Sequence, residues 1–161
     1  MHKILILLVL LLSLFKADSD PVLVDADAGQ ILAEVAKFKG DKPVMVNFWA
    51  TWCAPCVEEF PYMLELYREY DNDFALILVS GDFIDQRDEA LEFLKDQGVN
   101  FTSYFKKGKD NDFIRKISNQ WTGALPFTII YDMDGNVSTS WEGKADKERF
   151  ESELLKVLNP Q

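Results

Sequence analysis

The sequence holds little of what most metal sites and catalytic bases require. Its 161 residues include a single histidine, His2, and only two cysteines, Cys53 and Cys56. A structural zinc site needs about four ligands, and an attached haem needs C-x-x-C-H, whereas here Val57 occupies the fifth position. With His2 in the N-terminal leader described below, a Cys–His or Ser–His–Asp mechanism lacks its base. We therefore predict no metal ion and no bound cofactor.

Basic residues are also scarce. Seventeen Lys and Arg residues stand against 27 Asp and Glu, giving a formal net charge of −10, so a nucleic-acid partner is not expected. The hydrophobic content of 48% and the charged content of 27% are typical of a soluble globular protein. The length fits one domain, which we expect to be monomeric.

The N-terminus is typical of a secretory signal. Lys3 supplies a positive charge, residues 4–15 are almost all apolar, and residues 17–19 offer small side chains for cleavage. The apolar run is shorter than the roughly 20 residues that span a bilayer. We therefore predict a signal peptide over residues 1–19 and one domain over residues 20–161. An uncleaved segment that tethers the domain is the alternative.

Both cysteines lie where a buried strand leads into a helix. Residues 44–49 are nearly all apolar, and a helical pattern covers residues 54–70. A helix start favours negative charge, so Cys53 should ionise more readily there, and Cys56, one turn later, is placed to resolve a mixed disulfide. A purely structural bridge over so few residues would contribute little, on the order of 2 kcal/mol at most. The position therefore favours redox chemistry.

The remaining patterns predict an α/β domain. Helices are expected over residues 29–39, over 86–97 with Asp85 as its cap, and from Asp146 onward. Strands are expected over residues 74–80, 127–131 and 137–142, with an edge strand at 22–24. The order is βαβαβαββα, a mixed sheet with helices on both faces. Residues 101–105 and 113–117 are a further candidate strand and short helix.

The stretch around the cysteines resembles a known family. Residues 47–56, with the flanks 46–53 and 59–61 and the pair Leu125-Pro126, are similar to the extracytoplasmic TlpA/ResA-like thiol-disulfide oxidoreductases of the thioredoxin superfamily. The similarity covers roughly residues 28–158. It implies a thioredoxin-like fold in which the helix 86–97 and the strand after it are an inserted βα element. It also implies a redox-active disulfide between Cys53 and Cys56 and no other cofactor.

The resemblance also assigns a role to the proline at residue 126. In thioredoxin-like proteins the proline at this position is cis and faces the disulfide, which implies the same for the Leu125–Pro126 bond. A cis bond would turn the backbone groups of Leu125 toward the cysteines, where an extended partner chain could pair with them. The family often has Thr after this proline, and here the residue is Phe127.

A further expectation concerns proton transfer. Thioredoxin has a buried Asp where this chain has Asn47, and the TlpA/ResA-like branch instead uses a Glu shortly after the second cysteine, which Glu59 matches. Glu59 lies one helical turn after Cys56, and burial would raise its pKa toward that of a thiol. The alternative is that Glu58 and Glu59 only complement the helix N-terminus.

The sequence and the resemblance together predict an extracytoplasmic reductant of protein disulfides, most simply in a bacterial periplasm. The resemblance implies substrates such as the haem-site cysteines of apocytochrome c, and a membrane electron donor that recharges the pair. The residues expected to contact substrate are Trp52, Ala54, Pro55, Leu125 and Pro126. The open alternatives are a disulfide oxidase or isomerase, and a redox-inactive binding or holdase module.

Overall fold

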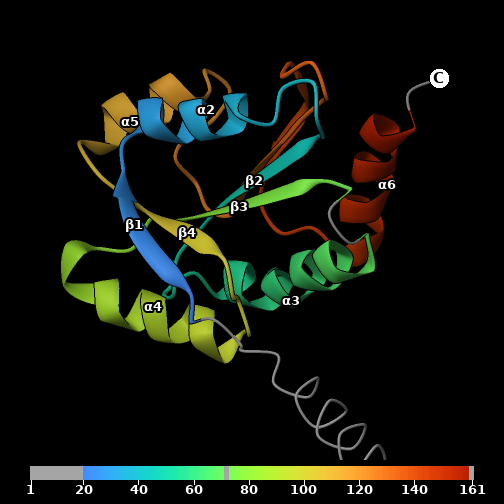
Figure 1. Cartoon of the computed structure of the whole chain (residues 1–161). Coiled ribbons are helices and arrows are strands. Elements are labelled where there is room, and N and C mark those ends of the chain that lie inside the picture. Colours follow the sequence, from blue (N-terminus) through green and yellow to red (C-terminus); the bar gives the residue numbers. More distant parts are fainter. Residues whose placement is uncertain (1–19, 71–72, 160–161) are drawn as a thin grey trace, which may run out of the picture.

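A computed structural model describes residues 20–70 and 73–159 (Figure 1). The chain forms a six-stranded sheet in the order β1-β4-β3-β2-β5-β6. Strands β1, β4, β3 and β2 run parallel, and β5 and β6 add an antiparallel hairpin next to β2. The strands are β1 (Val22–Ala26), β2 (Val44–Trp49), β3 (Ala75–Ser80), β4 (Thr102–Lys106), β5 (Phe127–Tyr131) and β6 (Val137–Glu142).

Helices cover both faces of the sheet, as Figure 1 shows. They are α2 (Ala28–Ala36), α3 (Ala54–Glu69), α4 (Arg87–Asp96), α5 (Asp110–Ile117) and α6 (Lys147–Leu158). Buried side chains of α2 and α5 pack in one apolar cluster with one face of the strands. Those of α3, α4 and α6 pack in a second cluster on the opposite face. The predicted thioredoxin-like class, with helices on both faces of a mixed sheet, is confirmed.

The two-residue repeat of the central strands decides which side chains meet which helices. In β2, Val44, Val46 and Phe48 belong to the cluster of α2 and α5. The alternate side chains of Met45 and Trp49 belong to the cluster of α3. Asn47 shares their parity and therefore faces α3. This single polar residue in a fully buried strand is thereby aimed at the helix that begins at the cysteines.

The predicted elements are present, with three differences. The candidate strand and helix at residues 101–105 and 113–117 are real, as β4 and α5, so the order has one more βα pair than βαβαβαββα. The helix predicted over residues 29–39 covers only 28–36, because Asp27 caps it one residue earlier and it ends before a turn. Asp85 does not cap α4. It lies in a 3₁₀ turn, Ile84–Gln86, closed by the Gln86 N–H on the Phe83 carbonyl at 2.8 Å, and α4 starts only at Arg87.

Candidate active site

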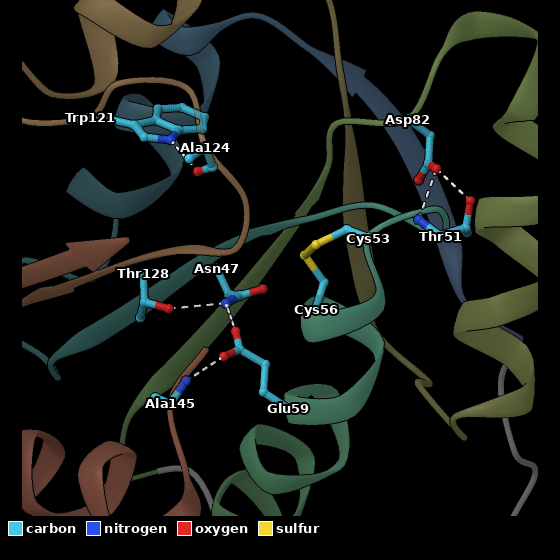
Figure 2. Close-up of a disulfide and its surroundings, with 10 residues drawn as sticks. All are labelled: Asn47, Thr51, Cys53, Cys56, Glu59, Asp82, Trp121, Ala124, Thr128 and Ala145. Atoms are coloured by element: carbon cyan, nitrogen blue, oxygen red, sulfur yellow. Dashed lines mark hydrogen bonds between the residues drawn. A yellow bond between two sulfur atoms is a disulfide. The ribbon is translucent and has the colours of Figure 1, made fainter. Parts of the chain in front are cut away.

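The two cysteines form a disulfide where α3 begins (Figure 2). Cys53 has extended backbone angles and is the N-cap of α3, and its carbonyl accepts the N–H of Val57 at 3.1 Å. The two Cα atoms are 5.2 Å apart. Cys53 is 5% exposed and Cys56 is fully buried. The helix start thus carries both cysteines, and Cys53 is the more exposed of the two.

Glu59 is buried beneath the disulfide and is held by two hydrogen bonds. The Asn47 amide donates to its Oε1 at 3.0 Å, and the Ala145 N–H donates to its Oε2 at 2.8 Å. Desolvation raises the pKa of Glu59 to about 7, because the charge of Lys144 and the two hydrogen bonds only partly offset the cost of burial. Glu59 is therefore a carboxyl that can gain or lose a proton near neutral pH.

Asn47 has used both of its amide hydrogens. The second one goes to the Thr128 hydroxyl at 3.0 Å, across the antiparallel pair of β2 and β5. The Asn47 carbonyl oxygen is buried and has no hydrogen-bond partner among the described residues. Figure 2 shows it on the side of the amide that faces Cys56. A buried acceptor without a donor is costly in a folded protein. The cysteines are oxidised here, and a cysteine S–H, which exists only when the disulfide is reduced, is a candidate donor to this oxygen.

A second buried carboxylate lies on the other side of the disulfide in the view of Figure 2. Asp82, after β3, accepts hydrogen bonds from the Thr51 N–H at 2.8 Å and from the Thr51 hydroxyl. It also accepts the Ser80 hydroxyl at 2.7 Å. These bonds join the loop that precedes Cys53 to the loop after the neighbouring strand.

This network was not predicted from the sequence, although a signal exists. Ser80 is the last residue of the buried strand β3, and Asp82 follows two residues later. Strand β3 runs parallel to β2, which leads to Cys53. The carboxyl ends of parallel strands meet at one edge of a sheet, where sites commonly form.

The residues expected to contact substrate lie at the same end of the sheet as the disulfide. Trp52, Ala54 and Pro55 are exposed around the start of α3. The Leu125–Pro126 bond is cis, as predicted, with Leu125 half-buried and Pro126 buried. Phe127 pairs with Phe48 near the end of β2, so Pro126 precedes β5 at the edge from which the cysteine loop leaves.

Glu58 differs from its neighbour. Its side chain is 59% exposed and pairs with Lys144 on the surface. In the described part of the chain no group of three or more His, Cys, Asp or Glu side chains is placed to hold a metal ion.

Comparison with known proteins identifies the family. The Redoxin family model matches residues 15–158. The chain belongs to the Redoxin family. It is 35% identical over 125 residues to the thiol-disulfide oxidoreductase ResA of Bacillus thuringiensis (strain Al Hakam), an alignment that covers 77% of this chain and 68% of the relative. It is 32% identical over 117 residues to ResA of Bacillus subtilis (strain 168), covering 72% of this chain and 60% of the relative.

A solved structure agrees. The thiol:disulfide interchange protein of the thioredoxin family from Chlorobium tepidum TLS superposes with a TM-score of 0.64 at 26% identity, over 77% of this chain and 84% of that one. This member of the Redoxin family is a thiol-disulfide oxidoreductase of the TlpA/ResA-like branch of the thioredoxin superfamily.

Proposed function

We propose that the chain reduces disulfides of protein substrates outside the cytoplasm, with Cys53 as the attacking thiol and Cys56 as the resolving one. The observation that carries this assignment is the difference between the two sulfurs. Cys53 caps α3 and retains some exposure, whereas Cys56 lies within the helix and is fully buried. Cys53 is therefore the cysteine that a partner disulfide can approach, and Cys56 is the more shielded of the two.

The reaction balances as a transfer of two electrons. The Cys53 thiolate attacks one sulfur of the substrate disulfide, which forms a mixed disulfide and releases the other substrate sulfur as a thiolate that takes up a proton. The Cys56 sulfur, after losing its proton, attacks the Cys53 sulfur. The Cys53–Cys56 disulfide forms, and the second substrate thiol leaves. A donor must then reduce the pair again, and the partner that fits this need is a membrane electron donor.

Glu59 is proposed to move the proton of the resolving thiol. It follows Cys56 by three residues, so both lie on one face of α3. With a pKa of about 7, it is partly ionised at neutral pH and can accept a proton in the buried site. The unpartnered carbonyl of Asn47 offers an acceptor for a thiol that exists only in the reduced state.

The direction of exchange follows from what surrounds the sulfurs. Strong oxidants of this kind stabilise their reduced form by holding the attacking thiolate in a favourable field. Here the sulfurs lie within the apolar cluster of α3, and the residues between them, Ala54 and Pro55, carry no charge. Both features make a thiolate costly relative to a disulfide, which favours a reductant.

The proposed location is the bacterial periplasm or an equivalent extracytoplasmic space. The predicted signal peptide, residues 1–19, lies outside the described residues. Among residues 20–70 and 73–159 no helix is long and apolar enough to cross a membrane. The remaining proposals are a single monomeric domain over residues 20–161 and, as substrates, apocytochrome c haem-site cysteines or other periplasmic thiols.

The test follows each cysteine separately. In the fully reduced protein, a limiting amount of iodoacetamide should label Cys53 first, as read by mass spectrometry. Cys53→Ser should abolish reduction of insulin, whereas Cys56→Ser should accumulate mixed disulfides with protein substrates in the native envelope. Preferential labelling of Cys56 would reverse the two roles. A wild-type protein without activity toward insulin would favour the binding or holdase alternative.

A further inference from the structure

Three large apolar side chains are exposed next to the disulfide. Trp52 is 51% exposed, Phe83 is 66% exposed and Ile84 is 75% exposed. The rings of Trp52 and Phe83 are stacked, with centroids 5.9 Å apart and planes 23° apart. Single exposed apolar residues are ordinary on protein surfaces, but a contiguous group beside a reactive sulfur indicates a contact surface. We call Trp52, Phe83 and Ile84 the rim patch.

The rim patch is fixed in place by the buried network of Asp82. Thr51 and Asp82 immediately precede Trp52 and Phe83, and the two hydrogen bonds between them tie together the segments that carry the two rings (Figure 2). The Gly81 N–H also bonds the Trp49 carbonyl at 2.7 Å. The surface is therefore formed before a partner arrives, which lowers the entropic cost of binding.

A hollow continues the rim patch away from the disulfide. It has a volume of about 280 Å³ and lies between the loop after β3 and the end of β4. Phe83, Ile84 and Phe105 supply its apolar lining. Charged residues line the rest of it, namely Lys106 and Lys107 together with Asp25, Asp82 and Asp110. Apolar and aromatic side chains combined with a few polar groups are the usual lining of a binding site.

We propose that the rim patch and this hollow bind a large apolar side chain of the protein substrate, placed within a few residues of its disulfide cysteine, and that Phe83 determines this specificity. The proposal rests on the proposed reduction of protein disulfides. Trp52 directly precedes Cys53 and stacks on Phe83, so the rim patch begins at the residue next to the attacking thiol. An extended segment of another protein fits the patch, whereas a small thiol would leave it uncovered.

The experiment compares two synthetic peptides that share one disulfide. One carries Leu and Phe beside the cysteines, and the other carries Ser at both positions. Burying one apolar side chain commonly changes specificity on the order of tenfold. We expect wild-type kcat/KM to be about tenfold higher for the apolar peptide, and Phe83→Ser to lose most of that difference through KM. Ile84→Ser provides a second variant at a still more exposed position, and urea midpoints confirm that both variants fold.

The matched control is Met133→Ser. Met133 is also exposed, at 45%, but it lies in the turn between β5 and β6, at the opposite end of the sheet from the cysteines. It should leave both kcat/KM values unchanged. A wild-type protein that reduces both peptides equally well, or rim variants that keep the full preference, would overturn the docking proposal and leave the reductase function standing. Failure to reduce either peptide would overturn both.

Discussion

Replacing Glu59 with Gln should remove a specific pH dependence of stability. Glu59 is fully buried, and its pKa is raised from 4.5 to about 7. Because the folded state keeps this proton at pH values where the unfolded chain has released it, the folded state binds more protons. The contribution of Glu59 to the free energy of unfolding is therefore fully present below pH 4.5 and is lost as the pH rises through 7.

The magnitude follows from the two pKa values. A difference between 4.5 and about 7 corresponds to roughly 3 kcal/mol, of which about 2 kcal/mol is lost between pH 5 and pH 7. Glu59→Gln also perturbs the hydrogen bonds from Asn47 and Ala145, but that cost does not depend on the titration of residue 59. The quantity to compare is therefore the slope of the free energy of unfolding against pH. A constant difference in that free energy between variant and wild type does not test the prediction.

The assay is urea unfolding of the oxidised protein at half-unit steps from pH 5 to pH 8. Subtracting the wild-type curve from the Glu59→Gln curve should show the variant gaining about 2 kcal/mol relative to wild type between pH 5 and pH 7. Glu58→Gln is the matched control, since Glu58 occupies the preceding position of the same helix but is 59% exposed. Parallel curves for wild type and Glu59→Gln would refute the claim that the buried carboxyl titrates near neutral pH.

Three further outcomes are expected. Asn47→Leu removes a hydrogen bond that lowers the pKa of Glu59, so that pKa should rise above about 7, as followed by NMR of a labelled glutamate carboxyl. Asp82→Ala leaves the Thr51 N–H and the Ser80 hydroxyl without their acceptor, so urea unfolding should show a free energy of unfolding lower by about 1–3 kcal/mol. The fluorescence of Trp52 should shift as well, because the loop that carries it is no longer held. The redox pair should equilibrate with glutathione or dithiothreitol buffers at roughly −200 to −270 mV, and a value more positive than about −150 mV would favour the oxidase alternative.

The part of the site that could be predicted from sequence is the part encoded locally. A buried strand, two cysteines and a helix follow one another within residues 44–70, so their mutual placement depends on short-range geometry. Glu59 is one helical turn from Cys56, and its burial follows from the same helix face. The cis bond before Pro126 came from the resemblance, since the residues alone favour a trans proline at a strand start.

The contacts that could not be predicted are those between distant segments. The N–H of Ala145 that holds Glu59 lies 86 residues away in a loop before α6, and no side-chain chemistry marks a backbone donor. The sequence marks Asp82 only as a polar residue at the end of a strand. Its partner Thr51 is set by the parallel pairing of β2 and β3. The prediction that Asp85 caps α4 was wrong. A 3₁₀ turn closed by the Gln86 N–H on the Phe83 carbonyl takes the place of the first helical turn, so the helix begins after Asp85.

The two buried carboxyl groups near the disulfide are held by different parts of the fold. Asp82 accepts the Thr51 N–H with Oδ1 and the Ser80 hydroxyl with Oδ2, so both of its oxygens are engaged in holding the loop before Cys53. Glu59 is bonded instead by groups on β2 and on the loop before α6, neither of which carries a sulfur or the rim patch, so it can change protonation without moving the attacking residue. We therefore propose that Asp82 positions the loop before Cys53 and that Glu59 transfers the proton. Under this proposal the site would exchange a proton in every cycle while the rim patch stays fixed.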